Sequence, residues 1–133
     1  MKYTPENITK LEENQVFVFG SNESGRHGLG AAKTAHEKFG AEYGVGEGST
    51  GSCYALPTKD KNLKTRSLKD IQYSIIKFLS VCNSNPDKEF LLTRIGMGLA
   101  NFKLEEIASL FKKYKPLPKN LILPKDFHDY IYQ

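Results

Sequence analysis

The sequence contains few cysteines and no long apolar run. Its two cysteines, Cys53 and Cys82, are too few for a disulfide scaffold, and each lies inside a short apolar segment. No run approaches the ~18 apolar residues of a membrane span, and no signal-type apolar stretch follows Met1. We therefore expect a soluble cytoplasmic protein with two reduced, buried thiols and no membrane partner.

Internal repeats, low-complexity segments and linkers are also missing. With 39% hydrophobic and 26% charged residues, the composition matches an ordinary globular protein and excludes a disordered or collagen-like chain. The length of 133 residues fits one domain, which we expect to span residues 1–133.

The charge balance is moderately basic. Nineteen Lys and Arg against 15 Asp and Glu give a net charge of +4, and basic residues gather in residues 59–69 and 112–125. This balance fits a partner that carries phosphate, either a nucleotide or a nucleic acid, and it also fits a plain solvated surface. Charge alone does not choose between them.

Four short apolar runs, at residues 16–19, 53–56, 90–92 and 121–123, predict strands that are covered on both faces. Helical patterns lie between them. The first follows Gly30, the second begins at Ser67 with Asp70 in a capping position, and the third ends before Pro116. This alternation predicts an α/β fold with a mostly parallel sheet and helices on both faces.

Two further segments carry weaker signals. Thr4 and Pro5 predict the cap and first residue of a short helix ahead of the first strand. Residues 43–52 predict a glycine-rich connector.

Glycine is unevenly distributed. Nine of the 11 glycines fall between Gly20 and Gly51, and the other two are Gly96 and Gly98. Ligands of open parallel sheets bind beyond the carboxyl ends of the strands, which are here followed by residues 20–30, 57–60 and 94–102. Both glycine clusters are therefore predicted to lie at the ligand-binding edge.

The first glycine-rich loop departs from the common phosphate motifs. Arg26 stands where a P-loop needs lysine, His27 replaces the magnesium-binding Ser or Thr, and Lys33 replaces the third glycine of a dinucleotide fingerprint. A glycine-rich loop that enters a helix still exposes backbone N–H groups to an anion. Two such loops on neighbouring strands form a candidate clamp for a diphosphate, and the alternative is a pair of tight turns that serve helix–sheet packing.

The histidines do not form a metal-binding set. His36 is predicted on the polar side of its helix, His128 lies near the carboxyl terminus, and only His27 lies in a loop at the ligand edge. We expect neither a bound metal nor a cofactor.

Two segments resemble the macrodomain family. Residues 28–40 (GLGAAKTAHEKFG) look like its glycine run leading into an alanine-rich helix, and residues 95–114 (IGMGLANFKLEEIASLFKKY) look like its second loop and the following helix. The nearest branch, which includes the terminal ADP-ribose glycohydrolase, shares the Ile-Gly-x-Gly-Leu loop and a Thr-Lys pair that matches Thr58 and Lys59. FVFGSN followed by GRHG also resembles small bacterial and phage proteins. The resemblance covers about residues 16–124.

The resemblance implies a three-layer αβα fold that binds ADP-ribose or a related nucleotide. It places the distal ribose and a phosphate in the first loop and the diphosphate on the second loop. The ligand-binding residues expected on this basis are Ser21, Asn22, Arg26, Gly28, Leu29, Gly30, Gly96, Met97, Gly98, Leu99, Ala100, Asn101 and Phe102.

Catalysis is a separate question. The resemblance implies that Lys59 attacks the anomeric carbon of the ribose, and we assign supporting catalytic roles to His27 and Asn22. Ala100 stands where that branch has an assisting aspartate, and a nucleophilic amine needs an acid–base partner. The possible activities are hydrolysis of an ADP-ribosyl compound and removal of phosphate from ADP-ribose-1''-phosphate.

Two other functions stay open. The basic clusters suit a nucleic-acid-binding module, although neither an RNA-binding aromatic motif nor a helix-turn-helix pattern is present. A non-catalytic scaffold with a vestigial pocket is the other, because Ala100 replaces the acid.

Overall fold

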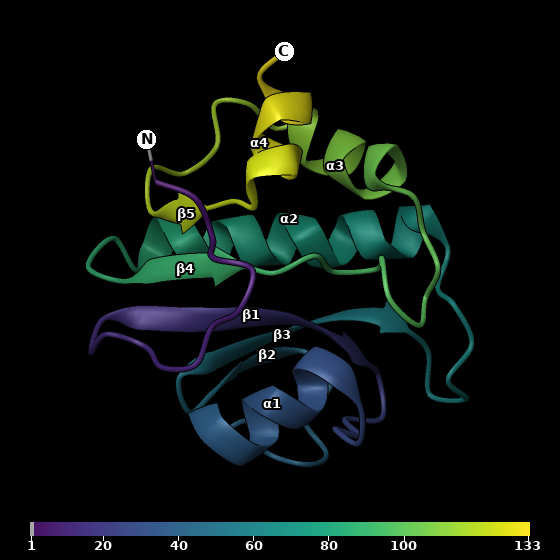
Figure 1. Cartoon of the computed structure of the whole chain (residues 1–133). Coiled ribbons are helices and arrows are strands. Elements are labelled where there is room, and N and C mark those ends of the chain that lie inside the picture. The colour runs from purple at the N-terminus through teal and green to yellow at the C-terminus, as the bar shows by residue number, and fades with distance from the viewer. Residues whose placement is uncertain (1) are drawn as a thin grey trace.

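A five-stranded sheet forms the centre of the molecule in a computed structural model that describes residues 2–133 (Figure 1). Along the chain the elements are β1 (Gln15–Asn22), α1 (Gly30–Phe39), β2 (Gly48–Thr50), β3 (Cys53–Lys59), α2 (Leu68–Ser84), β4 (Glu89–Leu92), α3 (Leu104–Lys112), β5 (Leu121–Ile122) and α4 (Lys125–Ile131). The strand order is β2-β3-β1-β4-β5. β1 pairs in parallel with β3 and β4, β4 pairs in parallel with β5, and β2 is antiparallel to β3.

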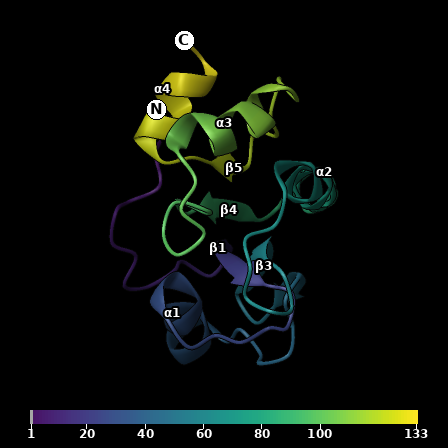
Figure 2. The ribbon, with the colours of Figure 1, turned by 90° about the vertical axis from the view of Figure 1, so that its right-hand side faces the viewer.

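The helices cover the two faces of the sheet. α1 lies on one face, and α2, α3 and α4 lie on the other (Figures 1 and 2). Each face has its own apolar cluster, which holds the buried residues of the helices on that side. The predicted α/β fold with a mostly parallel sheet and three αβα layers is therefore confirmed.

The continuous apolar runs follow from burial on both sides. Successive residues of a strand point to opposite faces. In β1, Val16 and Val18 therefore join the cluster beneath α2, whereas Phe17 and Phe19 join the cluster beneath α1. A strand with only one covered face would alternate with polar residues instead.

The start of α2 and the end of α3 agree with the sequence signals predicted for them. The Ser67 side chain accepts a hydrogen bond from the Asp70 N–H (3.1 Å), and α2 begins at the next residue. At the start of α3, the Glu106 carboxylate accepts from the Lys103 N–H (2.9 Å). α3 ends at Lys112, four residues ahead of Pro116.

The expected helix at Thr4 and Pro5 is wrong, because residues 2–14 contain no helix. Thr4 instead bonds to the end of the sheet. Its N–H donates to the Leu123 carbonyl (2.8 Å) and its hydroxyl donates to the Ile122 carbonyl (3.0 Å). Thr4 therefore bonds to residues more than a hundred positions away in the sequence and does not cap a helix.

Two elements went unpredicted. The connector expected over residues 43–52 contains β2, which pairs with β3 through the partners Gly48–Ala55, Ser49–Tyr54 and Thr50–Cys53. The chain also ends in α4, which buries Phe127 and Ile131 against the larger cluster.

The two thiols are buried and unpaired. Cys53 belongs to the cluster beneath α1 and Cys82 to the cluster beneath α2, so the sheet separates them. Burial raises the pKa of each thiol to about 12, which keeps both protonated. No helix within residues 2–133 combines the length and apolar character needed to cross a bilayer.

Candidate functional site

A cavity of about 610 Å³ lies at the carboxyl ends of β1, β3 and β4. Both glycine-rich loops line it, together with the end of β3 and the turn that follows. The expected site residues that line the cavity are Ser21, Asn22, Arg26, Gly28, Leu29, Gly30, Lys59, Gly96, Gly98, Leu99 and Ala100. Parallel pairing therefore brings together most of the residues that the sequence pattern singled out.

The side chain of Asn22 shapes the first loop. Its Oδ1 accepts hydrogen bonds from the Arg26 N–H (2.9 Å) and the Ser24 hydroxyl (2.8 Å), and its Nδ2 donates to the Arg26 carbonyl (2.8 Å). These bonds close the chain into a tight turn directly after β1. Asn22 lines the cavity as expected, and most of its hydrogen-bonding capacity is spent on the loop itself.

The glycine-rich connector supports this turn from behind. The Ser21 hydroxyl donates to the Gly46 carbonyl, and the Gly44 N–H donates to the Gly25 carbonyl (3.0 Å). A Cβ on Gly46 would overlap the Asn22 carbonyl, and one on Gly25 would overlap the Gly44 backbone. Glycine is needed here because two backbone segments touch.

The amino terminus of α1 opens onto the cavity. Leu29 is its N-cap, no side chain caps it, and its first turn contains no acidic residue. Gly30, Ala31 and Ala32, the first three helical residues, line the cavity. The first N–H groups of a helix have no partner within the helix, so this end offers donors and a partial positive charge to an anion.

The second loop turns back on itself between β4 and α3. Gly96 has a φ of +77°, and its carbonyl accepts from the Phe102 N–H (2.7 Å). The Asn101 N–H donates to the Gly98 carbonyl (2.9 Å). This turn holds Gly96, Gly98 and Ala100 against the cavity.

Three expected ligand residues of the second loop do not line the cavity. Met97 and Phe102 pack against the larger apolar cluster, and Asn101 sits in the closing turn with a φ of +62°. Within this turn Met97 and Phe102 therefore serve the core, whereas Asn101 is exposed to solvent.

His27 lies behind the first loop, away from the cavity lining. It is 1% exposed, its ring contacts Phe19 at 5.3 Å between centroids, and its Nε2 bonds to the Glu42 carbonyl (2.9 Å). Burial is the largest effect on this ring and lowers its pKa, so the neutral form is favoured. The supporting catalytic role expected for His27 therefore has no geometric support.

The cavity wall is positively charged. Arg26, Lys59 and Arg94 line it, and its lining contains no Asp or Glu. Arg94 also forms an ion pair with Asp126, at 3.1 Å between Nη2 and Oδ1. Even with Arg94 paired, Arg26 and Lys59 leave the lining with a net positive charge, which favours an anionic ligand.

A third wall comes from the end of β3 and the turn after it. The buried Thr58 and the partly buried Lys59 form its inner part, and Leu63 forms its outer part. Leu63 is 43% exposed and has a φ of +62°, which L side chains rarely adopt. The Asp60 carboxylate holds the turn by accepting from the Asn62 N–H (2.8 Å) and the Lys64 N–H (3.0 Å).

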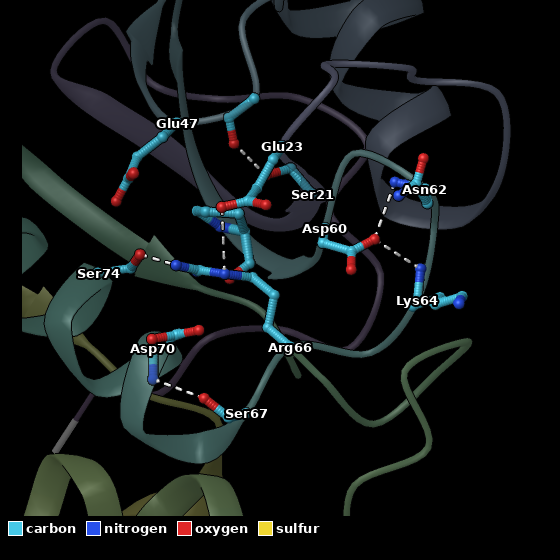
Figure 3. A network of polar contacts seen from close by, with 12 residues as sticks. Ser21, Glu23, Glu47, Asp60, Asn62, Lys64, Arg66, Ser67, Asp70 and Ser74 are labelled. Atoms are coloured by element: carbon cyan, nitrogen blue, oxygen red, sulfur yellow. Dashed lines mark hydrogen bonds and ion pairs between the residues drawn. The ribbon is translucent and has the colours of Figure 1, made fainter.

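Arg66 ties this third wall to the rest of the site (Figure 3). Its guanidinium donates to the Pro57 carbonyl (2.6 Å) and to the Ser74 hydroxyl of α2 (2.9 Å). It also pairs with Glu23 of the first loop at 3.5 Å, and its side chain is only 10% exposed. One buried cation therefore fixes β3, α2 and the first loop relative to one another.

Eight lining residues were absent from the sequence-based prediction: Gly20, Ala31, Ala32, Thr58, Leu63, Thr93, Arg94 and Ile95. Gly20, Thr58, Arg94 and Ile95 lie in segments that the strand-end rule had selected, so a sequence signal existed for them. Leu63 carried no sequence signal, because its place in the cavity lining depends on how the turn after β3 folds and not on a motif.

Within residues 2–133, no three His, Cys, Asp or Glu side chains gather in an arrangement that would hold a metal ion. No protein-family model, curated protein or solved structure matches the chain. The chemistry of the cavity therefore carries the functional conclusion.

Replacing Gly46 with alanine tests the contact behind the first loop. The new Cβ would overlap the Asn22 carbonyl, and such overpacking costs about 1–3 kcal/mol of unfolding free energy. Urea denaturation measures the loss. Gly28→Ala is the matched control, because a Cβ there meets nothing within 4 Å. Equal stabilities of the two variants would contradict the contact.

Replacing Leu63 with glycine tests the strained turn. Glycine adopts positive φ without steric cost, so Leu63→Gly should raise the unfolding free energy by about 0.5–1 kcal/mol. Leu99→Gly is the control, since Leu99 is also exposed but is not among the positive-φ residues. This control should lower stability by about as much. A loss of stability in both variants would show that Leu63 is not strained.

Proposed function

We propose that this protein binds ADP-ribose or a closely related nucleotide with a diphosphate, in the cavity at the carboxyl edge of the sheet. The observation that carries the proposal is the cationic lining, in which Arg26, Lys59 and Arg94 surround a space that no carboxylate enters. A diphosphate is the group whose charge and hydrogen-bond acceptors match this wall.

The shape of the cavity supports a ligand of this size. Its volume of about 610 Å³ falls within the ordinary range of ~300–1,000 Å³ for small-molecule sites. Its backbone donors lie on two sides, at the start of α1 and in the Gly96–Ala100 turn. Phosphate oxygens between these sides would accept from both, and the Arg26 guanidinium would donate to two oxygens at once.

The ends of the ligand meet different surroundings. Thr58 supplies a hydroxyl, and Asn22 keeps one amide N–H beyond its bonds within the loop; both groups suit the hydroxyls of a ribose. Three exposed leucines, Leu29, Leu63 and Leu99, line the cavity and would contact the flat, less polar parts of a nucleotide. A ligand with sugar, phosphate and base fits this mixture better than a simple anion does.

Binding without turnover is the function that the geometry favours. Lys59 lines the cavity, which is the position an attacking amine requires, but Ala100 occupies the place of its expected acid partner. No other carboxylate lines the cavity, and His27 lies outside the lining. Lys59 then acts as a charge that holds phosphate, and the hydrolase and phosphatase reactions lack their acid–base group.

Calorimetric titration with ADP-ribose tests this proposal. The wild-type protein should bind with a Kd below about 1 mM, and Arg26→Ala should weaken binding about tenfold or more through the loss of a charge-assisted contact. Lys61→Ala, which removes one positive charge outside the cavity lining, is the control and should change the affinity little. Absence of binding by the wild type at millimolar ADP-ribose would refute the proposal.

A further inference from the structure

The last part of the chain holds most of the net charge. Residues 107–133 contain five lysines and two aspartates, so they carry +3 of the chain's +4. No Asp or Glu occurs between Glu106 and Asp126. α3, α4 and the loop that joins them to β5 therefore present an unusually basic surface on the side of the sheet opposite α1 (Figures 1 and 2).

Aromatic rings lie among these lysines. The Lys112 ammonium is 5.2 Å from the Tyr130 ring centroid, and the Lys115 ammonium is 5.4 Å from that of Tyr132. The sequence does not show this interleaving, because each pair joins α3 or the residues just after it to α4. We call the surface formed by Tyr3, Lys112, Lys115, Lys125, His128, Tyr130 and Tyr132 the Lys–Tyr face.

The aromatic part of the Lys–Tyr face is continuous. The His128 ring contacts Tyr3 at 5.3 Å and Tyr132 at 4.7 Å between centroids. Lys125 adds a third cation, 5.9 Å from the Tyr3 ring centroid. Tyr132 is 47% exposed, so part of this row of rings is open to solvent.

The positive charge of the face is largely unneutralised. The two aspartates of α4 already have partners, Asp126 with Arg94 (3.1 Å) and Asp129 with Lys125 (2.8 Å). In the part of the chain that the structure describes, no ion pair involves the four lysines of residues 112–119. A surface that offers several ammonium groups without a carboxylate partner beside one exposed ring, Tyr132, and three half-buried rings suits a partner with repeated phosphates and flat rings.

We propose that the Lys–Tyr face binds single-stranded nucleic acid, with the lysines on the phosphates and Tyr132 and its neighbours against the bases. Stacking on aromatic rings requires unpaired bases, which favours a single strand over a duplex. A lipid surface fits less well, because the exposed large apolar side chains include no aliphatic residue of this face. None of its residues lines the cavity, so the proposal stands independently of nucleotide binding there.

Fluorescence anisotropy with a labelled single-stranded oligonucleotide tests the charge component, at salt concentrations between 50 and 200 mM. Binding should weaken steeply with salt, with a log–log slope of about −0.7 for each phosphate contacted. Lys112→Gln combined with Lys115→Gln should weaken binding and reduce the magnitude of that slope by about 1.4. The control is Lys61→Gln combined with Lys64→Gln, which removes the same charge from the turn after β3 and should change the slope little.

Tyr132→Leu tests the aromatic component, since it removes the ring and leaves the charge unchanged. It should weaken single-strand binding on the order of tenfold with the salt slope unaltered. Three results would overturn the proposal: no binding at 50 mM salt, equal losses in the two double-lysine variants, or an unchanged affinity in Tyr132→Leu. Equal affinity for a duplex or for anionic lipid vesicles would also overturn it, because either would show a general attraction to polyanions.

Discussion

The site depends on the parallel pairing of β1 with two neighbours at once. β1 pairs with β3 from Phe17 to Asn22 and with β4 from Gln15 to Val18. Strands that run in the same direction end at the same edge, so three chain segments far apart in sequence deliver their following loops to one place. A shift of one residue in either pairing would move each buried strand side chain to the opposite face of the sheet and so into the other apolar cluster. The two clusters therefore fix the register and with it the cavity.

The glycines serve this arrangement in two ways. Gly25 and Gly46 lie where the first loop touches the segment behind it, and no side chain fits between the two backbones. Gly28 and Gly98 have open space around them and line the cavity, where they let a ligand approach the backbone. The segment predicted as a glycine-rich connector, residues 43–52, therefore supports the binding loop.

The sequence predicted what local patterns and layer rules determine. Buried runs such as residues 16–19 and the Ser67 cap carried their own signals, and the strand-end rule placed Arg26 and Lys59 at one edge. Prediction from the sequence failed where contacts with residues far away in the chain determine the local structure. Thr4 bonds to Leu123 instead of capping a helix, and the chain folds His27 behind its loop. The third wall depends on the Asp60 turn and on Arg66, whose partners come from three separate segments.

The central claim is that backbone donors from two loops, together with the cations of the same lining, hold a diphosphate in one cavity. An NMR titration of the 15N-labelled protein with ADP-ribose tests it most directly, because each backbone amide reports its own surroundings. We expect the largest chemical-shift changes at the amides of residues 28–32 and 96–100, in both loops together. Shifts confined to one loop, or located in residues 107–133 with both loops unchanged, would contradict it.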